Sequence, residues 1–145
     1  LVHTYARMEL TLAEGALASL GEVLGGVAWA ERAKGAEGFQ RLDQARPHIM
    51  AILERLVEAE EWEAVDGLGW SIEDYLDLGG FPSERIQLSN WGIKAAQGRK
   101  NRQDEGRWLN ILGIAYNSLG QVEKAIQQGA RLVAGGKRVG QRGHF

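Results

Sequence analysis

Carboxylate pairs are the groups in this chain whose types and spacing come nearest to those of a catalytic site. Glu73 stands next to Asp74, and Asp104 stands next to Glu105. Two carboxyl groups can share general acid and general base roles when both reach the same substrate. Neighbours along a helix point in different directions, so neither pair is expected to do so.

Metal, thiol and phosphate chemistry are not indicated either. Three histidines have no acidic or histidine partner at the spacing of a metal site, and we interpret them as solvated or capping side chains. They are His3, His48 and His144. Gly136-Lys137 has Arg138 and Arg131 at the places where a phosphate-binding loop needs serine or threonine and glycine. With no cysteine and no serine nucleophile motif, the chain is predicted not to be an enzyme and to hold no cofactor or metal.

The composition is that of a folded protein rather than a disordered one. Apolar residues make up 44% of the 145 positions and charged residues 25%, enough for one domain or a few stacked helical hairpins. The absence of cysteine fits a reducing compartment, and no apolar run approaches the roughly 20 residues that cross a bilayer. We therefore expect a cytoplasmic protein without a membrane segment. The chain begins at Leu1 without methionine, which suggests a piece of something longer.

Charge is distributed unevenly along the chain. Residues 54–84 carry ten acidic side chains against Arg55 alone, which gives this segment a net charge of −9 and the remainder +7. Such a block is usually a solvated helix surface, and it could instead face a basic partner. The ten are Glu54, Glu58, Glu60, Glu61, Glu63, Asp66, Glu73, Asp74, Asp77 and Glu84.

Apolar residues recur at three- and four-residue steps along most of the chain, which is the periodicity of helices. The pattern predicts helices over 9–34, 43–59, 62–79, 83–98, 104–120 and, more weakly, from 122 onward. Pro47 is placed early in its helix, where proline is tolerated. No alternating strand pattern is present, so an all-α chain of six or seven helices with short connections is expected. Glycines are predicted to end the helices at Gly35 and Gly38, Gly79-Gly80, Gly98 and Gly120.

A short internal repeat indicates how these helices are arranged. Tyr75-x-x-Leu78-Gly79-Gly80-Phe81 recurs 41 residues later as Tyr116-x-x-Leu119-Gly120-Gln121-Val122. In each copy the tyrosine would fill the gap between two helices, a glycine would take the left-handed turn conformation, and the last residue would start the return helix. One hairpin cannot bury its apolar face, so the repeat predicts stacked antiparallel hairpins in an α-solenoid.

The second copy resembles the tetratricopeptide repeat, whose pattern is W-x2-L-G-x2-Y followed by a small residue. The matching residues are Leu109, which replaces the tryptophan, Leu112, Gly113, Tyr116, Leu119, Gly120 and Ala125. The earlier copy, over 67–98, departs from the pattern with Ser71 and Ile72 where leucine and glycine are expected. The long period is similar to that of the extended-helix variant of this repeat.

A wider resemblance is to bacterial signal-transduction ATPases of the STAND class, which contain an NB-ARC-like nucleotide-binding part. Residues 3–6 resemble the tail of its winged helix, and residues 42–49 and 75–80 resemble the helices that lead into its repeats. The resemblance implies a helical linker region over 1–60 and repeats over 61–145, with hairpins at about 61–98 and 103–135. Residues 129–145 do not continue the repeat pattern well.

The resemblance also implies a function, that of a sensor or regulatory arm acting through protein–protein contacts. Its partner would be a protein or peptide, or another domain of the same parent chain, and an exposed final hairpin could form a homo-oligomer. The ligand would lie on the first helix of each hairpin, although these positions could equally be solvated. The outward positions are Arg107, Asn110, Ile114 and Asn117 in the later copy, and Asp66, Glu73 and Asp77 in the earlier one.

Nucleic-acid binding is the alternative function. Basic residues in the turn before 103 and near the C-terminus could contact phosphates, and tryptophans can stack on bases. The near-neutral net charge argues against this, and core packing explains the five tryptophans better. The basic residues are Arg99, Lys100, Arg102, Arg107, Lys137, Arg138 and Arg142, and the tryptophans are Trp29, Trp62, Trp70, Trp91 and Trp108.

Overall fold

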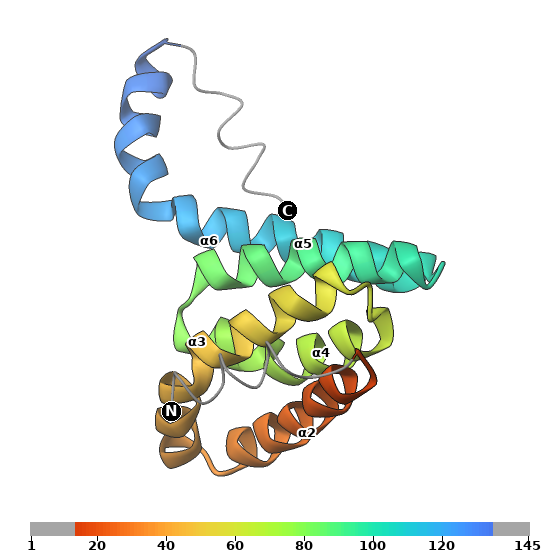
Figure 1. Ribbon diagram of the computed structural model, residues 1–145. Helices are drawn as coiled ribbons and strands as arrows, with labels where there is room; N and C mark the ends of the chain where they lie inside the picture. Colours follow the sequence, from red (N-terminus) through yellow and green to blue (C-terminus); the bar gives the residue numbers. More distant parts are fainter. Residues whose placement is uncertain (1–13, 135–145) are drawn as a thin grey trace.

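The computed structural model describes the backbone of residues 14–134 and the side chains of residues 15–121, and this part of the chain is all-α, as predicted (Figure 1). Consecutive helices pack largely as antiparallel neighbours. The helices are α2 (Glu14–Ala33), α3 (Ala36–Glu58), α4 (Trp62–Gly79), α5 (Pro82–Gly98) and α6 (Arg102–Ala134).

The start of α3 differs from the prediction of a helix over 43–59. Gly35, with a φ of 73°, turns the chain after α2, and α3 begins directly after it. Gly38 does not end a helix but lies in the first turn of α3, where any Cβ atom would overlap the carbonyl oxygen of Glu31. Pro47 therefore lies inside α3 and not in its first turn. Burial of Leu42 and Ile49 on either side of Pro47 offsets the backbone hydrogen bond that proline cannot make.

The turn between α4 and α5 is the one that the repeat predicts. Gly80 takes the left-handed conformation, with φ 76° and ψ 45°, and caps the C-terminus of α4. Pro82 then opens α5, where its missing N–H group has no intrahelical partner to lose. Tyr75 is buried, with 1% of its surface exposed, and its ring lies 5.5 Å from that of Phe81. The hairpin predicted at 61–98 is confirmed.

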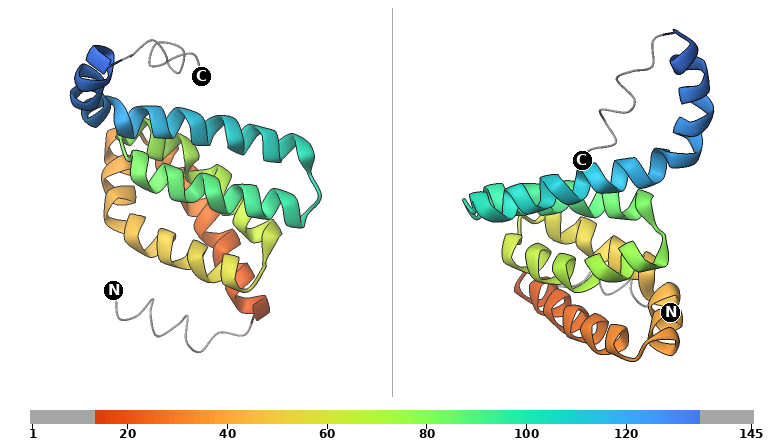
Figure 2. Two further views of the ribbon diagram at one scale, coloured as in Figure 1. Left: turned by 90° about the horizontal axis from the view of Figure 1, so that it is seen from above. Right: turned by 180° about the vertical axis from the view of Figure 1, so that it is seen from behind.

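The second predicted hairpin, at 103–135, is wrong. Gly120 does not end a helix, because α6 is continuous from Arg102 to Ala134. A single helical glycine costs about 1 kcal/mol relative to alanine, and good helix formers such as Lys124 and Ala125 follow it closely. Figures 1 and 2 show α6 changing direction in its C-terminal part, where it leaves the other helices.

The repeat that the structure contains has a period of 40 residues instead of 41. The turn before α4 and the turn before α6 have the same hydrogen bonds: Glu61 N–H donates to the Leu56 carbonyl at 2.9 Å, and Asn101 N–H donates to the Ala96 carbonyl at 2.8 Å. The two tyrosines of the sequence repeat are consequently not equivalent. Tyr116 is 52% exposed, because no return helix covers that face of α6.

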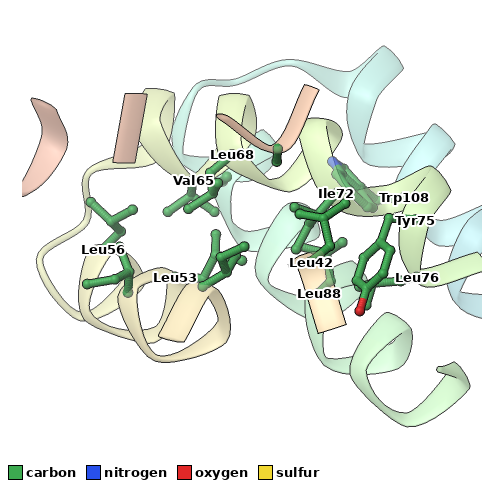
Figure 3. Packing of buried hydrophobic residues seen from close by; sticks show 14 of the residues in the cluster. Leu42, Leu53, Leu56, Val65, Leu68, Ile72, Tyr75, Leu76, Leu88 and Trp108 are labelled. Carbon is green, nitrogen blue, oxygen red and sulfur yellow. The ribbon is translucent and has the colours of Figure 1, made fainter. Parts of the chain in front are cut away.

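The buried residues of all five helices form one core (Figure 3). α2 packs against both α3 and α4, α4 against α5, and α5 against α6. Trp108 of α6 is fully buried and extends the core to the last helix. The division at residue 60 stays a prediction, with core residues on both sides of it. The larger core side chains are Leu42, Ile52, Leu53, Leu56, Val65, Leu68, Ile72, Tyr75, Leu76, Leu88 and Trp108.

Candidate protein-binding face

A hollow of about 460 Å³ lies where α2, α4 and α6 meet. These three helices are every second one in the chain, and α4 is the first helix of the confirmed hairpin. We call this hollow the aromatic hollow. Its lining residues are Trp29 from α2, Trp70, Glu73 and Asp74 from α4, and Arg107, Asn110 and Ile111 from α6.

One wall of the aromatic hollow is Trp70, whose orientation is fixed from two sides. Its indole ring stacks on that of Trp108, with the ring centroids 3.9 Å apart and the planes 24° from parallel. Its Nε1–H donates a hydrogen bond to Asp66 Oδ1 at 2.9 Å. A tryptophan held in this way offers a large apolar surface to a ligand without losing further side-chain entropy on binding.

Two arginines flank the tryptophans of the aromatic hollow. The Arg107 guanidinium lies 4.1 Å from the Trp70 ring centroid, and that of Arg32 lies 4.3 Å from the ring of Trp29. Each arginine also has a carboxylate partner: Arg107 is 3.2 Å from Asp104, and Arg32 pairs with Asp74. Trp29 nevertheless remains 48% exposed, so its apolar surface is available to a ligand.

The acidic residues near the aromatic hollow are in different electrostatic states. Glu73 is buried and pairs with Arg85 of α5, which also lies 3.2 Å from Asp77. Burial raises the pKa of the Asp66 carboxyl above its usual range, although Arg99, at 3.4 Å, opposes this shift. Neither Glu73 nor Asp66 therefore offers a free negative charge, and their ion pairs join neighbouring elements instead.

Three of the seven predicted ligand-facing residues line the aromatic hollow. These are Glu73, Arg107 and Asn110, which come from two helices. Asp66 lies behind Trp70, and Asp77 is used by Arg85. Ile114 is 37% exposed, and it and Asn117 lie further along α6, outside the hollow.

Sequence reasoning missed the aromatic part of this face. Trp29 and Trp70 were interpreted as core residues with the other tryptophans, but Trp29 is largely exposed and Trp70 partly so. The high tryptophan content was the available signal. The other repeat-defining residues do not line the hollow: Leu78, Gly79, Leu119 and Tyr116 are exposed, Leu112, Gly113 and Gly120 are half-buried, Tyr75 is buried, and the Ala125 side chain lies outside the described residues.

The described residues give little support to the nucleic-acid alternative. Arg99 of the basic turn lies 3.4 Å from Asp66 and 3.5 Å from Asp104, so carboxylates neutralise it. Asp104 also pairs with Arg107. The C-terminal basic residues Lys137, Arg138 and Arg142 lie outside the described part of the chain.

Metal and membrane sites were searched for among the described residues. Residues 15–121 contain no group of three histidine or acidic side chains that could hold a metal ion. None of the helices described is long and apolar enough to cross a bilayer. Comparison of the chain with models of protein families, with curated proteins and with solved structures gave no significant match.

Proposed function

We propose that this chain is a helical-repeat module of the tetratricopeptide kind, which binds a protein partner through the aromatic hollow. The observation that carries the proposal is the origin of that hollow. Its walls come from α2, α4 and α6, the alternate helices of the stack, and it contains a half-exposed tryptophan next to a rigidly held one. Exposed aromatic side chains in a concave surface are typical of sites that bind proteins.

The repeated turn supports the same proposal from another direction. A 40-residue unit made of a turn and two helices can be stacked indefinitely, and each unit adds to the surface formed by its first helix. The sequence resemblance to STAND ATPases suggests the context: the module would be the regulatory arm of a longer signalling protein. In that setting its partner is an inducing protein or another domain of the same parent chain.

Site-specific photocrosslinking tests the proposal and identifies the partner. A crosslinking amino acid is placed at Trp29 or Asn110 in the hollow, and as a control at Glu54, an exposed position of α3. We expect the two hollow positions to label one protein, or one other segment of the parent chain, that the control position does not label.

Affinity then decides whether the labelled protein is a ligand of the aromatic hollow. Trp29→Ala removes the largest exposed apolar surface there, and we expect it to weaken binding of the purified partner at least roughly tenfold. Glu54→Ala serves as the matched control. Equal labelling from all three positions, or an unchanged affinity of the Trp29 variant, would overturn the proposal.

A further inference from the structure

The aromatic hollow is one end of a longer groove along the seam between α2 and α4. A second hollow, of about 210 Å³, shares Trp29 with it and continues over Gly25, Gly26 and Gly67. A third, of about 680 Å³, shares Glu22, Glu63, Ala64 and Gly67 with the second and reaches Glu61 and Arg99. The shared residues give the order of the three hollows, and we call them together the seam groove.

Glycines make the middle of the seam groove open. Cβ atoms added at Gly26 and Gly67 would meet no other atom within 4 Å, so the backbones of α2 and α4 are bare there. This middle part is the smallest of the three hollows. A helical ligand is about 10–12 Å wide with its side chains, whereas an extended chain is thinner and suits a narrow groove better.

The far end of the seam groove is negatively charged. Glu22, Glu61 and Glu63 line it, and none of the three has an ion-pair partner within the described residues. The positive charge of Arg99 at the same end is balanced by Asp66 and Asp104. This end is therefore complementary to a positively charged ligand.

We propose that the ligand of the seam groove is an extended, basic segment of another polypeptide. Its lysine or arginine side chains would lie near Glu22, Glu61 and Glu63, and a bulky apolar side chain would lie between Trp29 and Trp70. This inference rests on the proposed function, because it gives the chemistry of the partner that the aromatic hollow binds.

Peptide selection tests the chemistry of the ligand. A display library of random linear peptides is selected against the chain at low salt, and binders are eluted with high salt, which screens charge attraction. We expect the selected peptides to carry lysine or arginine on one side of a leucine or an aromatic residue. Acidic or uncharged peptides, or no selective binding at all, would contradict the proposal.

Two matched glycine substitutions test the path of the ligand. Gly67→Leu places a side chain in the narrow middle of the groove, whereas Gly106→Leu adds one at an equally open glycine of α6 that does not line it. Both exchanges favour helix formation, so loss of folding does not explain an effect. We expect Gly67→Leu to weaken binding of the selected peptides at least roughly tenfold and Gly106→Leu to leave it unchanged.

Charge removal completes the test and separates the two proposals. Exchange of Glu22, Glu61 and Glu63 to glutamine should weaken binding of the basic peptides about tenfold and reduce its dependence on salt. Suppose that Trp29→Ala abolishes binding while Gly67→Leu and the glutamine exchanges do not. The aromatic hollow would then remain the binding site, and the inference about a basic ligand along the seam groove would be wrong.

Discussion

Glu60 and Lys100 occupy the same position in two turns, 40 residues apart, and both take a left-handed backbone conformation. Their φ angles are 55° and 57°. The residue before each donates to the last turn of its helix, Ala59 N–H to Arg55 and Arg99 N–H to Ala95, at 3.0 and 2.9 Å. Neither residue is a glycine, so the two turns carry the same backbone strain, and each ends one helix where the next helix of the stack begins.

Replacement of either residue by glycine should stabilise the protein. The left-handed conformation costs a residue with a Cβ atom about 1 kcal/mol or more, and glycine adopts it freely. We expect Glu60→Gly and Lys100→Gly each to raise the free energy of unfolding by up to ~1 kcal/mol in urea titrations. Gln97→Gly, at an exposed position inside α5, should lower it by about 1 kcal/mol. A loss of stability in all three variants would show that the turns are not strained.

Gly92 is predicted to tolerate no side chain, because a Cβ atom there would overlap the indole ring of Trp108. Gly92→Ala should lower the melting temperature, with a loss of about 1–3 kcal/mol, since α5 and α6 must move apart. Gly106→Ala is the control: its Cβ atom meets nothing within 4 Å, and alanine favours the helix. This variant should be slightly more stable than the unchanged protein. Equal melting temperatures of the two variants would rule out close packing at Gly92.

The buried pair of Glu73 and Arg85 gives a prediction about charge. Arg85→Met leaves the Glu73 carboxylate buried without its partner and should cost about 3–5 kcal/mol. Exchange of both, Glu73→Leu with Arg85→Met, should restore most of that loss, because no unpaired charge remains. Arg55→Met breaks the exposed pair with Glu58, at 3.7 Å, and should change stability by less than about 1 kcal/mol. A double variant as unstable as Arg85→Met alone would contradict this account.

Tyr75 should make the protein less stable at high pH. Burial, and then its hydrogen bond to Asp43 at 2.6 Å, raise the pKa of the Tyr75 hydroxyl above its usual value. Above about pH 10 the unfolded chain loses this proton while the folded protein keeps it, so the free energy of unfolding falls as pH rises. Below that pH the contribution is fully present.

Urea titrations of two phenylalanine variants measure this effect. Tyr75→Phe loses the hydrogen bonds to Asp43 and from Arg46, so we expect it to cost about 1.5–3 kcal/mol at neutral pH. It should also lose stability less steeply above about pH 10. Tyr116→Phe changes an exposed tyrosine and should leave both quantities unchanged. The prediction fails if the alkaline loss is as steep in Tyr75→Phe as in the unchanged protein.

Some errors in the sequence-based prediction share one cause, which is that glycine and proline were interpreted without their tertiary contacts. Gly38 and Pro47 looked like helix boundaries, yet packing of α3 on α2 and α4 holds both inside one helix. Gly120 has the same local signal as Gly79-Gly80, but α6 continues through it. The signal was reliable only at Gly80, where Phe81 and Tyr75 pack over the turn.

The amino-acid sequence alone determined that the chain is helical, where α4 and α5 end, and that Tyr75 is a core residue, because these depend on periodicity and on contacts between near neighbours. Only the tertiary structure decided the 40-residue period and the candidate site. The aromatic hollow joins Trp29, Trp70 and Arg107 from three helices, and which of them is exposed depends on how α2, α4 and α6 pack. A helical pattern predicts which face of a helix is apolar, but it does not indicate which neighbouring helix covers that face.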